Sequence, residues 1–148
     1  MMIEKNKDLV RKYFEGMFNR HDVGVADEVF SSDYINHQEY NTNREDVARG
    51  REGFKKVAQT FYSAFPDLKS TIEDIIAADD KVVVRWVTRG THSGSFMGIA
   101  PTNRQVTVTG ITIDRIADGK IAESWTSWNV MDLIQQIGGL TESLEAAA

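Results

Sequence analysis

The sequence contains no cysteine, which excludes disulfide bonds, thiolate nucleophiles and cysteine-ligated metals. Its longest apolar runs, such as IIAA and VVV, are far too short to cross a bilayer as a helix. The N-terminal stretch MMIEKNKDLVRKYF is amphipathic and lacks the apolar block of a signal peptide. We therefore expect a cytoplasmic protein without a membrane partner.

Positive charge is also scarce. The chain of 148 residues has 17 Lys and Arg against 22 Asp and Glu, giving a net charge of −5. Because nonspecific nucleic-acid binding depends on neutralising phosphates, and the basic residues form no patch, we expect no nucleic-acid partner. The three histidines form no H-x-x-x-H or H-E-x-x-H pair, and no G-x-G-x-x-G or Walker loop is present. We therefore expect neither a metal nor a cofactor.

Apolar residues recur at helical spacing in two stretches of the chain. Residues 3–19 and 51–65 each carry an aromatic face opposite Lys, Arg and Glu, which predicts two amphipathic helices. Pro66 ends the second helix. Between them, DYINH (33–37) alternates and predicts a short strand, whereas the polar segment 38–50 is expected to be a loop or lid.

Beyond Pro66 the apolar period changes to that of strands. Strands are predicted over 68–78, 81–92, 105–116 and 121–130, with a short helix over 131–139. Helices followed by hairpin-connected strands predict an α+β fold with a curved antiparallel or mixed sheet. N-terminal helices on its concave side would leave a cone with an interior. We expect one domain over residues 1–140, followed by a tail (141–148) that is frayed or left from expression.

Several ordered motifs resemble the SnoaL-like polyketide cyclases, the ester-cyclase type of the NTF2-like superfamily. They are GTHSGSFMGIAPTNRQV (90–106), ITIDRIADGKIAESW (111–125) and DLIQQIG (132–138), supported by DYINH, GREG and AFPDL. The resemblance spans roughly residues 5–140. It implies a cone-shaped NTF2-like fold, a homodimer formed through the outer face of the sheet, and ring closure of a polyketide by an intramolecular aldol condensation without metal or cofactor.

The family pattern also implies a catalytic aspartate after an E-x-W motif. Here Glu123 and Trp125 match, but Asn129 occupies the aspartate position. An amide donates and accepts hydrogen bonds without titrating. Because alternate side chains of a strand share a face, we place Trp125 and Asn129 together on the cavity wall. Trp128 is then expected on the outer face, at a dimer interface.

His37 is the natural acid or base, because imidazole titrates near neutral pH and the resemblance places a histidine here near the cavity. We predict a cyclase, or related lyase or isomerase, acting on a hydrophobic carbonyl compound. Asn129 would polarise the carbonyl, His37 would move the proton, and Trp125 would stack on the substrate. Further predicted substrate contacts are Trp86, His92, Tyr13, Phe61, Phe65 and Met97.

Two alternatives remain open from the sequence. The loss of the aspartate suits a protein that keeps the pocket but only binds a small apolar molecule, or that acts as a dimeric interaction module. A different enzyme on the same scaffold, such as a hydrolase or dehydratase, ranks last. Hydration of an epoxide would require an Asp and Arg arrangement around a water, and no such inward set is evident.

Overall fold

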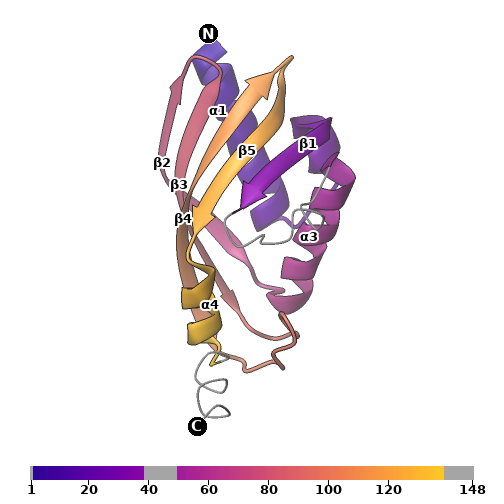
Figure 1. Cartoon of the computed structure of the whole chain (residues 1–148), viewed down its shortest axis with the longest axis vertical. Helices are drawn as coiled ribbons and strands as arrows, with labels where there is room; N and C mark the ends of the chain where they lie inside the picture. Colours follow the sequence, from indigo (N-terminus) through magenta and orange to yellow (C-terminus); the bar gives the residue numbers. More distant parts are fainter. Residues whose placement is uncertain (1, 39–49, 139–148) are drawn as a thin grey trace.

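The computed structural model describes residues 2–38 and 50–138 (Figure 1). The first predicted helix is present as α1 (Met2–Tyr13), which continues into a π-helical turn, η1 (Phe14–Asn19). The short helix α2 (Val25–Val29) leads into the first strand. The second amphipathic helix, α3 (Gly50–Ala64), ends two residues before Pro66, as the sequence predicts.

Five strands form one mixed sheet in the order β1-β5-β4-β3-β2. The strands are β1 (Phe30–Gln38), β2 (Lys69–Ala78), β3 (Lys81–Thr91), β4 (Gln105–Ala117) and β5 (Lys120–Trp128). β1 pairs with β5 in parallel, and the other neighbours are antiparallel. Figure 1 shows the sheet curving round α1 and α3, with α4 (Val130–Gln136) following the end of β5. The predicted α+β fold with helices on the concave side is confirmed.

An irregularity in β5 decides which side chains face the interior. Ile121 pairs with Ile116, whereas Glu123 pairs with Arg115, so Ala122 is an extra residue in the ladder. Such a bulge shifts the alternation of side chains by one position. Ile121 and Ser124 are therefore both buried, and from Ser124 onward the even-numbered residues face inward.

The buried core lies between the concave face and the helices. Aromatic rings of Tyr13, Phe30, Tyr34 and Phe54 pack against one another with centroids 4.1–6.1 Å apart. None of the helices in the described ranges is long and apolar enough to cross a membrane. Residues 39–49 of the predicted loop or lid, and the tail 141–148, lie outside the described residues.

Candidate functional site

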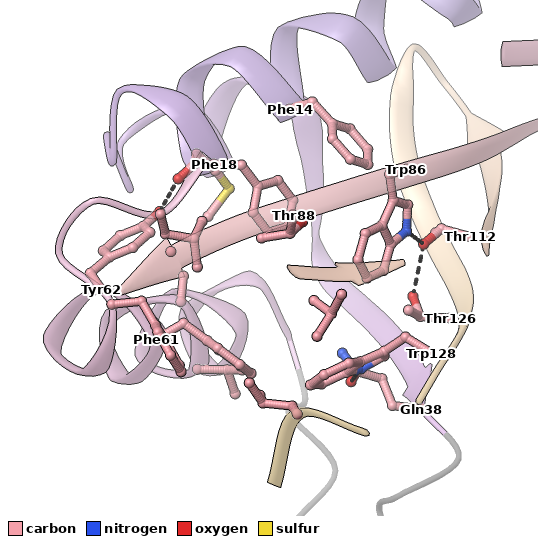
Figure 2. Close-up of a pocket in the computed structure, with 18 of the residues that line it drawn as sticks. Phe14, Phe18, Gln38, Phe61, Tyr62, Trp86, Thr88, Thr112, Thr126 and Trp128 are labelled. Carbon is pink, nitrogen blue, oxygen red and sulfur yellow. Dashed lines mark hydrogen bonds between the residues drawn. The ribbon is translucent and has the colours of Figure 1, made fainter. Parts of the chain in front are cut away.

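A pocket opens between the concave face of the sheet and the helices, with a cavity volume of about 110 Å³. Its lining is predominantly apolar and rich in aromatic rings, as is typical of sites for small organic ligands. Figure 2 shows rings from η1, α3 and β3 turned toward the same space. The lining rings include Phe14, Phe18, Phe54, Phe61, Phe65 and Trp128.

A row of hydrogen bonds crosses the sheet at one wall of this pocket (Figure 2). The indole N–H of Trp86 donates to Thr112 Oγ1 at 3.0 Å, and the hydroxyls of Thr112 and Thr126 lie 3.3 Å apart. Thr126 Oγ1 donates to Asn36 Oδ1 at 3.0 Å. Because an indole can only donate, the row runs in one direction from Trp86 to the amide oxygen of Asn36.

This direction determines what Asn36 offers to a ligand. Its side-chain oxygen is occupied by Thr126, and its amide nitrogen has no hydrogen-bond acceptor among residues 2–38 and 50–138. Asn36 is only 5% exposed, yet it lines the pocket. The arrangement therefore presents an oriented N–H donor on an otherwise apolar wall.

A glycine opposite Trp86 makes room for the first member of the row. Trp86 and Gly110 are direct partners on β3 and β4. A Cβ on Gly110 would lie 2.3 Å from the indole ring, closer than carbon atoms can approach. The absence of a side chain at Gly110 thus lets the indole lie flat across β4 and reach Thr112.

Further polar residues line the pocket. Trp128 Nε1 donates to Gln38 Oε1 at 3.2 Å, which joins the last residues of β5 and β1. Arg89 is also one of the lining residues. No Asp, Glu or His side chain lines the pocket in the part of the chain that the structure describes.

A carboxyl group is buried on the same inward column of β4, two residues beyond Thr112. Asp114 is 0% exposed, and burial raises its pKa to about 7. Its Oδ1 accepts a hydrogen bond from Ser124, which in turn accepts one from the Tyr34 hydroxyl at 2.8 Å. Among the described residues, its Oδ2 has no hydrogen-bond partner.

The two residues assigned catalytic roles from the sequence, His37 and Asn129, do not line this pocket. His37 lies on the outer face of the sheet, where its Nε2 is 2.8 Å from Glu123 Oε2 and its ring stacks on Trp125 at 5.6 Å. Asn129 lies beyond the end of β5 and caps α4 by accepting the Asp132 N–H at 3.0 Å. Their predicted placement is wrong, so the catalytic roles that depend on it lose their geometric basis.

The position of Asn129 outside the strand explains the error for the tryptophans. Trp125, expected on the cavity wall, is 38% exposed on the outer face. Trp128, expected outside, lines the pocket. Both placements reverse the prediction because the two faces were counted back from Asn129, which lies beyond the end of β5 and not in the pocket.

The predicted substrate contacts divide into two groups. Trp86, Tyr13, Phe61 and Phe65 line the pocket, although contact with a substrate stays a prediction. The other two do not line it.

His92 is buried behind Phe65, with its ring centroid 5.7 Å from that of the phenyl ring. Its Nδ1 accepts the Thr102 N–H at 3.2 Å, so it holds the loop that follows β3, and burial lowers its pKa. Met97, in that loop, is 63% exposed.

The polar row was missed from the sequence, although signals for it exist. Tyr34, Asn36 and Gln38 alternate along β1 and share the inward face. Thr112 lies in the alternating run TVTGITID, in which the inward residues are the smaller ones around Gly110. Alternation could have placed these residues on a common face, but the hydrogen bonds between strands require the register.

The curved mixed sheet, the helices on its concave side and the pocket between them define an NTF2-like fold. The model of the SnoaL-like polyketide cyclase family matches residues 7–137, and the chain belongs to this family. Membership supports an enzyme of the cyclase type.

Solved structures agree with this assignment. IdmH of Streptomyces antibioticus, assigned as a polyketide cyclase, is 33% identical with a TM-score of 0.77, over 90% of this chain and 98% of that one. TsrD of Streptomyces laurentii is 26% identical with a TM-score of 0.81, over 92% and 96%. AclR of Streptomyces galilaeus, assigned as a hydroxylase, is 28% identical with a TM-score of 0.78, over 92% and 97%. No curated protein sequence matches the chain.

Proposed function

We propose that the protein catalyses ring closure of a hydrophobic, polyketide-like carbonyl compound, without a cofactor, by an aldol-type reaction. The observation that carries this proposal is the hydrogen-bond row that ends on Asn36 inside an aromatic pocket. Membership of the SnoaL-like family supports the cyclase class. The aldol step and the substrate are the proposed part.

The geometry suits the demands of an aldol closure. The attacking carbon loses its proton to solvent, and the carbonyl that is attacked develops negative charge on its oxygen, which the Asn36 N–H can stabilise until solvent protonates it. The hydrogen-bond row holds the amide in place before the substrate arrives. Removing such a preorganised donor from an enzyme lowers the reaction rate by about 10²- to 10³-fold. The Asn36 amide cannot titrate and therefore contributes by polarising the carbonyl. This is the role that the sequence analysis gave to Asn129, now assigned to a different residue.

The aromatic walls supply the second requirement, which is folding the substrate so that its reacting carbons meet. Phe61 and Trp128 lie with ring centroids 6.3 Å apart at an angle of 63°, and Phe61 also contacts Phe96. A flat conjugated ligand can lie against the wall that these rings form while its oxygens face the polar row. Holding reactive groups in contact converts a rare encounter into a probable one, which is a large part of many rate enhancements.

The test is single-turnover cyclisation of a synthetic aromatic polyketide ester, followed by mass spectrometry and absorbance. Asn36→Leu removes the donor at similar volume and should lower the rate by about 10²-fold. Thr112→Val should lower it less, because it releases the amide without removing it. The matched control is Thr109→Val, three residues away on the exposed face of β4. An unchanged rate in Asn36→Leu would refute the assigned role.

One observation favours a second candidate, a pocket that binds without turnover. The described lining contains no carboxylate or imidazole to move a proton. The same experiment separates the two functions: quenching of tryptophan fluorescence by the ester with no cyclised product would establish binding alone.

The partner expected from the family is a second copy of the chain, and the outer face of the sheet suits it. Ile111 and Trp125 are 48% and 38% exposed there, on neighbouring strands β4 and β5. We propose this face as the homodimer contact. Sedimentation equilibrium should show a dimer that Ile111→Lys converts to monomer, and a wild-type monomer would contradict the proposal.

A further inference from the structure

One pocket-lining hydroxyl has no partner in the described structure. Tyr13, the last residue of α1, is 5% exposed and lines the pocket, and nothing within residues 2–38 and 50–138 accepts or donates a hydrogen bond at its hydroxyl. Tyr62, which also lines the pocket, donates its hydroxyl to the backbone oxygen of Met17. The Tyr13 hydroxyl is therefore available to a ligand in the pocket in a way that the Tyr62 hydroxyl is not.

The buried carboxyl group of Asp114 is close enough to Tyr13 to contribute to its raised pKa. The titratable side chains that face Asp114 are Tyr13 from α1 and Tyr34 from β1, and β5 contributes the Ser124 hydroxyl. β3 presents only Val82 and Val84. No cation is paired with Asp114 among the described residues, since Arg115 pairs with Glu123 instead.

Tyr13 and Asp114 influence each other electrostatically. The pKa of Tyr13 is raised well above its usual value, first by burial and then by the nearby Tyr34 and Asp114. Negative charge on both Asp114 and a neighbouring group is unfavourable, because like charges repel strongly where water is excluded. A negative charge arriving on a ligand beside Tyr13 therefore favours the protonated form of Asp114.

We propose that this end of the pocket is an oxyanion-binding site, in which the Tyr13 hydroxyl donates to an enolate or phenolate oxygen and Asp114 is protonated when that charge is present. Asp114 is a positioning residue in this arrangement, since it acts through Tyr13, and its proton comes from solvent. The inference rests on the proposed function for the identity of the ligand as a carbonyl compound that forms an enolate. The Tyr13 hydroxyl is then a second polar contact for the ligand, in addition to the Asn36 amide.

The test uses 2,4-dinitro-1-naphtholate, an anion across the working pH range, and its neutral analogue 2,4-dinitro-1-methylnaphthalene. Affinities come from quenching of tryptophan fluorescence, and proton uptake comes from calorimetry in two buffers of different ionisation enthalpy. We expect the affinity for the naphtholate to fall by up to about tenfold per pH unit above the pKa of Asp114, which is about 7, with close to one proton taken up per ligand. The neutral analogue should show neither effect.

Two variants assign these effects to residues. Asp114→Asn cannot titrate and should abolish both the pH dependence and the proton uptake. Tyr13→Phe should weaken naphtholate binding by about tenfold or more while leaving the neutral analogue unaffected, because it removes one hydrogen bond to a charged oxygen. Tyr62→Phe is the matched control, and it should leave the ratio of the two affinities unchanged because the Tyr62 hydroxyl is already bonded to the backbone.

Three outcomes would overturn the proposal: equal pH profiles for the two ligands in the wild-type protein, pH dependence that survives in Asp114→Asn, or equal losses for both ligands in Tyr13→Phe. If Asp114→Asn fails to fold, proton uptake by the wild-type protein decides. The outcome is independent of catalysis. Naphtholate binding as expected in a protein that closes no ring would leave the oxyanion site standing and refute the cyclase function.

Discussion

The free energy of unfolding of this protein should contain a contribution from Asp114 that is lost as pH rises. Burial raises the pKa of this carboxyl from 3.8 to about 7. The native state therefore holds the proton more tightly than the unfolded chain does. The contribution of Asp114 is fully present below its unfolded pKa and is lost as pH rises through about 7. At 1.36 kcal/mol per unit, the loss reaches about 4 kcal/mol.

The assay is urea unfolding of the wild-type protein and Asp114→Asn at a series of pH values. The amide matches the carboxyl in shape but does not titrate, so the other ionisable groups largely cancel in the difference. We expect the difference in free energy of unfolding to shift in favour of Asp114→Asn by as much as about 4 kcal/mol between about pH 4 and about pH 8. Any constant offset from unsatisfied amide protons does not affect this slope.

A surface aspartate provides the control for this slope. Asp74 pairs with Arg85 in an exposed ion pair, and such pairs contribute about 0–1 kcal/mol. Asp74→Asn should therefore give a difference that changes little over the same range. Parallel curves for the wild-type protein and Asp114→Asn would show that the carboxyl is not held protonated by burial.

Two further predictions follow from side chains that contact each other. Gly110→Ala should lower the free energy of unfolding by about 1–3 kcal/mol, because the new methyl group overlaps the Trp86 indole. Thermal melting measures this loss, and an unchanged melting temperature with normal ligand binding would contradict the described contact. His37→Ala should change the affinity for 2,4-dinitro-1-methylnaphthalene by no more than about twofold, because the imidazole ring lies on the outer face beside Glu123. A loss of affinity of about tenfold or more would show that His37 contacts the ligand and would contradict this placement.

The order and type of the secondary-structure elements could be predicted from the sequence, because the apolar period changes sharply at Pro66. The four later strands lie within one or two residues of their predicted limits at most ends. The first helix was predicted as one piece over 3–19, but it becomes π-helical from Phe14. That change leaves the apolar face intact, so the pattern of residues could not reveal it.

The composition of the site could not be predicted, because it depends on which face each residue occupies. Ala122 is the extra residue in β5, and a small side chain there leaves no mark on the alternation. Asn129 has φ −87° and ψ 88° outside the strand, so counting alternate residues back from it gave the wrong face. The relay between Thr112, Thr126 and Asn36 requires the register of three strands, which local sequence does not encode.

The bulge at Ala122 has a consequence for how such a pocket tolerates a change in strand length. Deleting this one residue would restore regular pairing without exchanging the two faces of β5, because Ile121 and Ser124 both face inward and would then be two residues apart. The hydroxyls of Ser124 and Thr126 would stay inside, and Glu123 and Trp125 would stay outside. In this fold, the bulge residue can thus be lost without altering the polar side chains that β5 turns toward the interior.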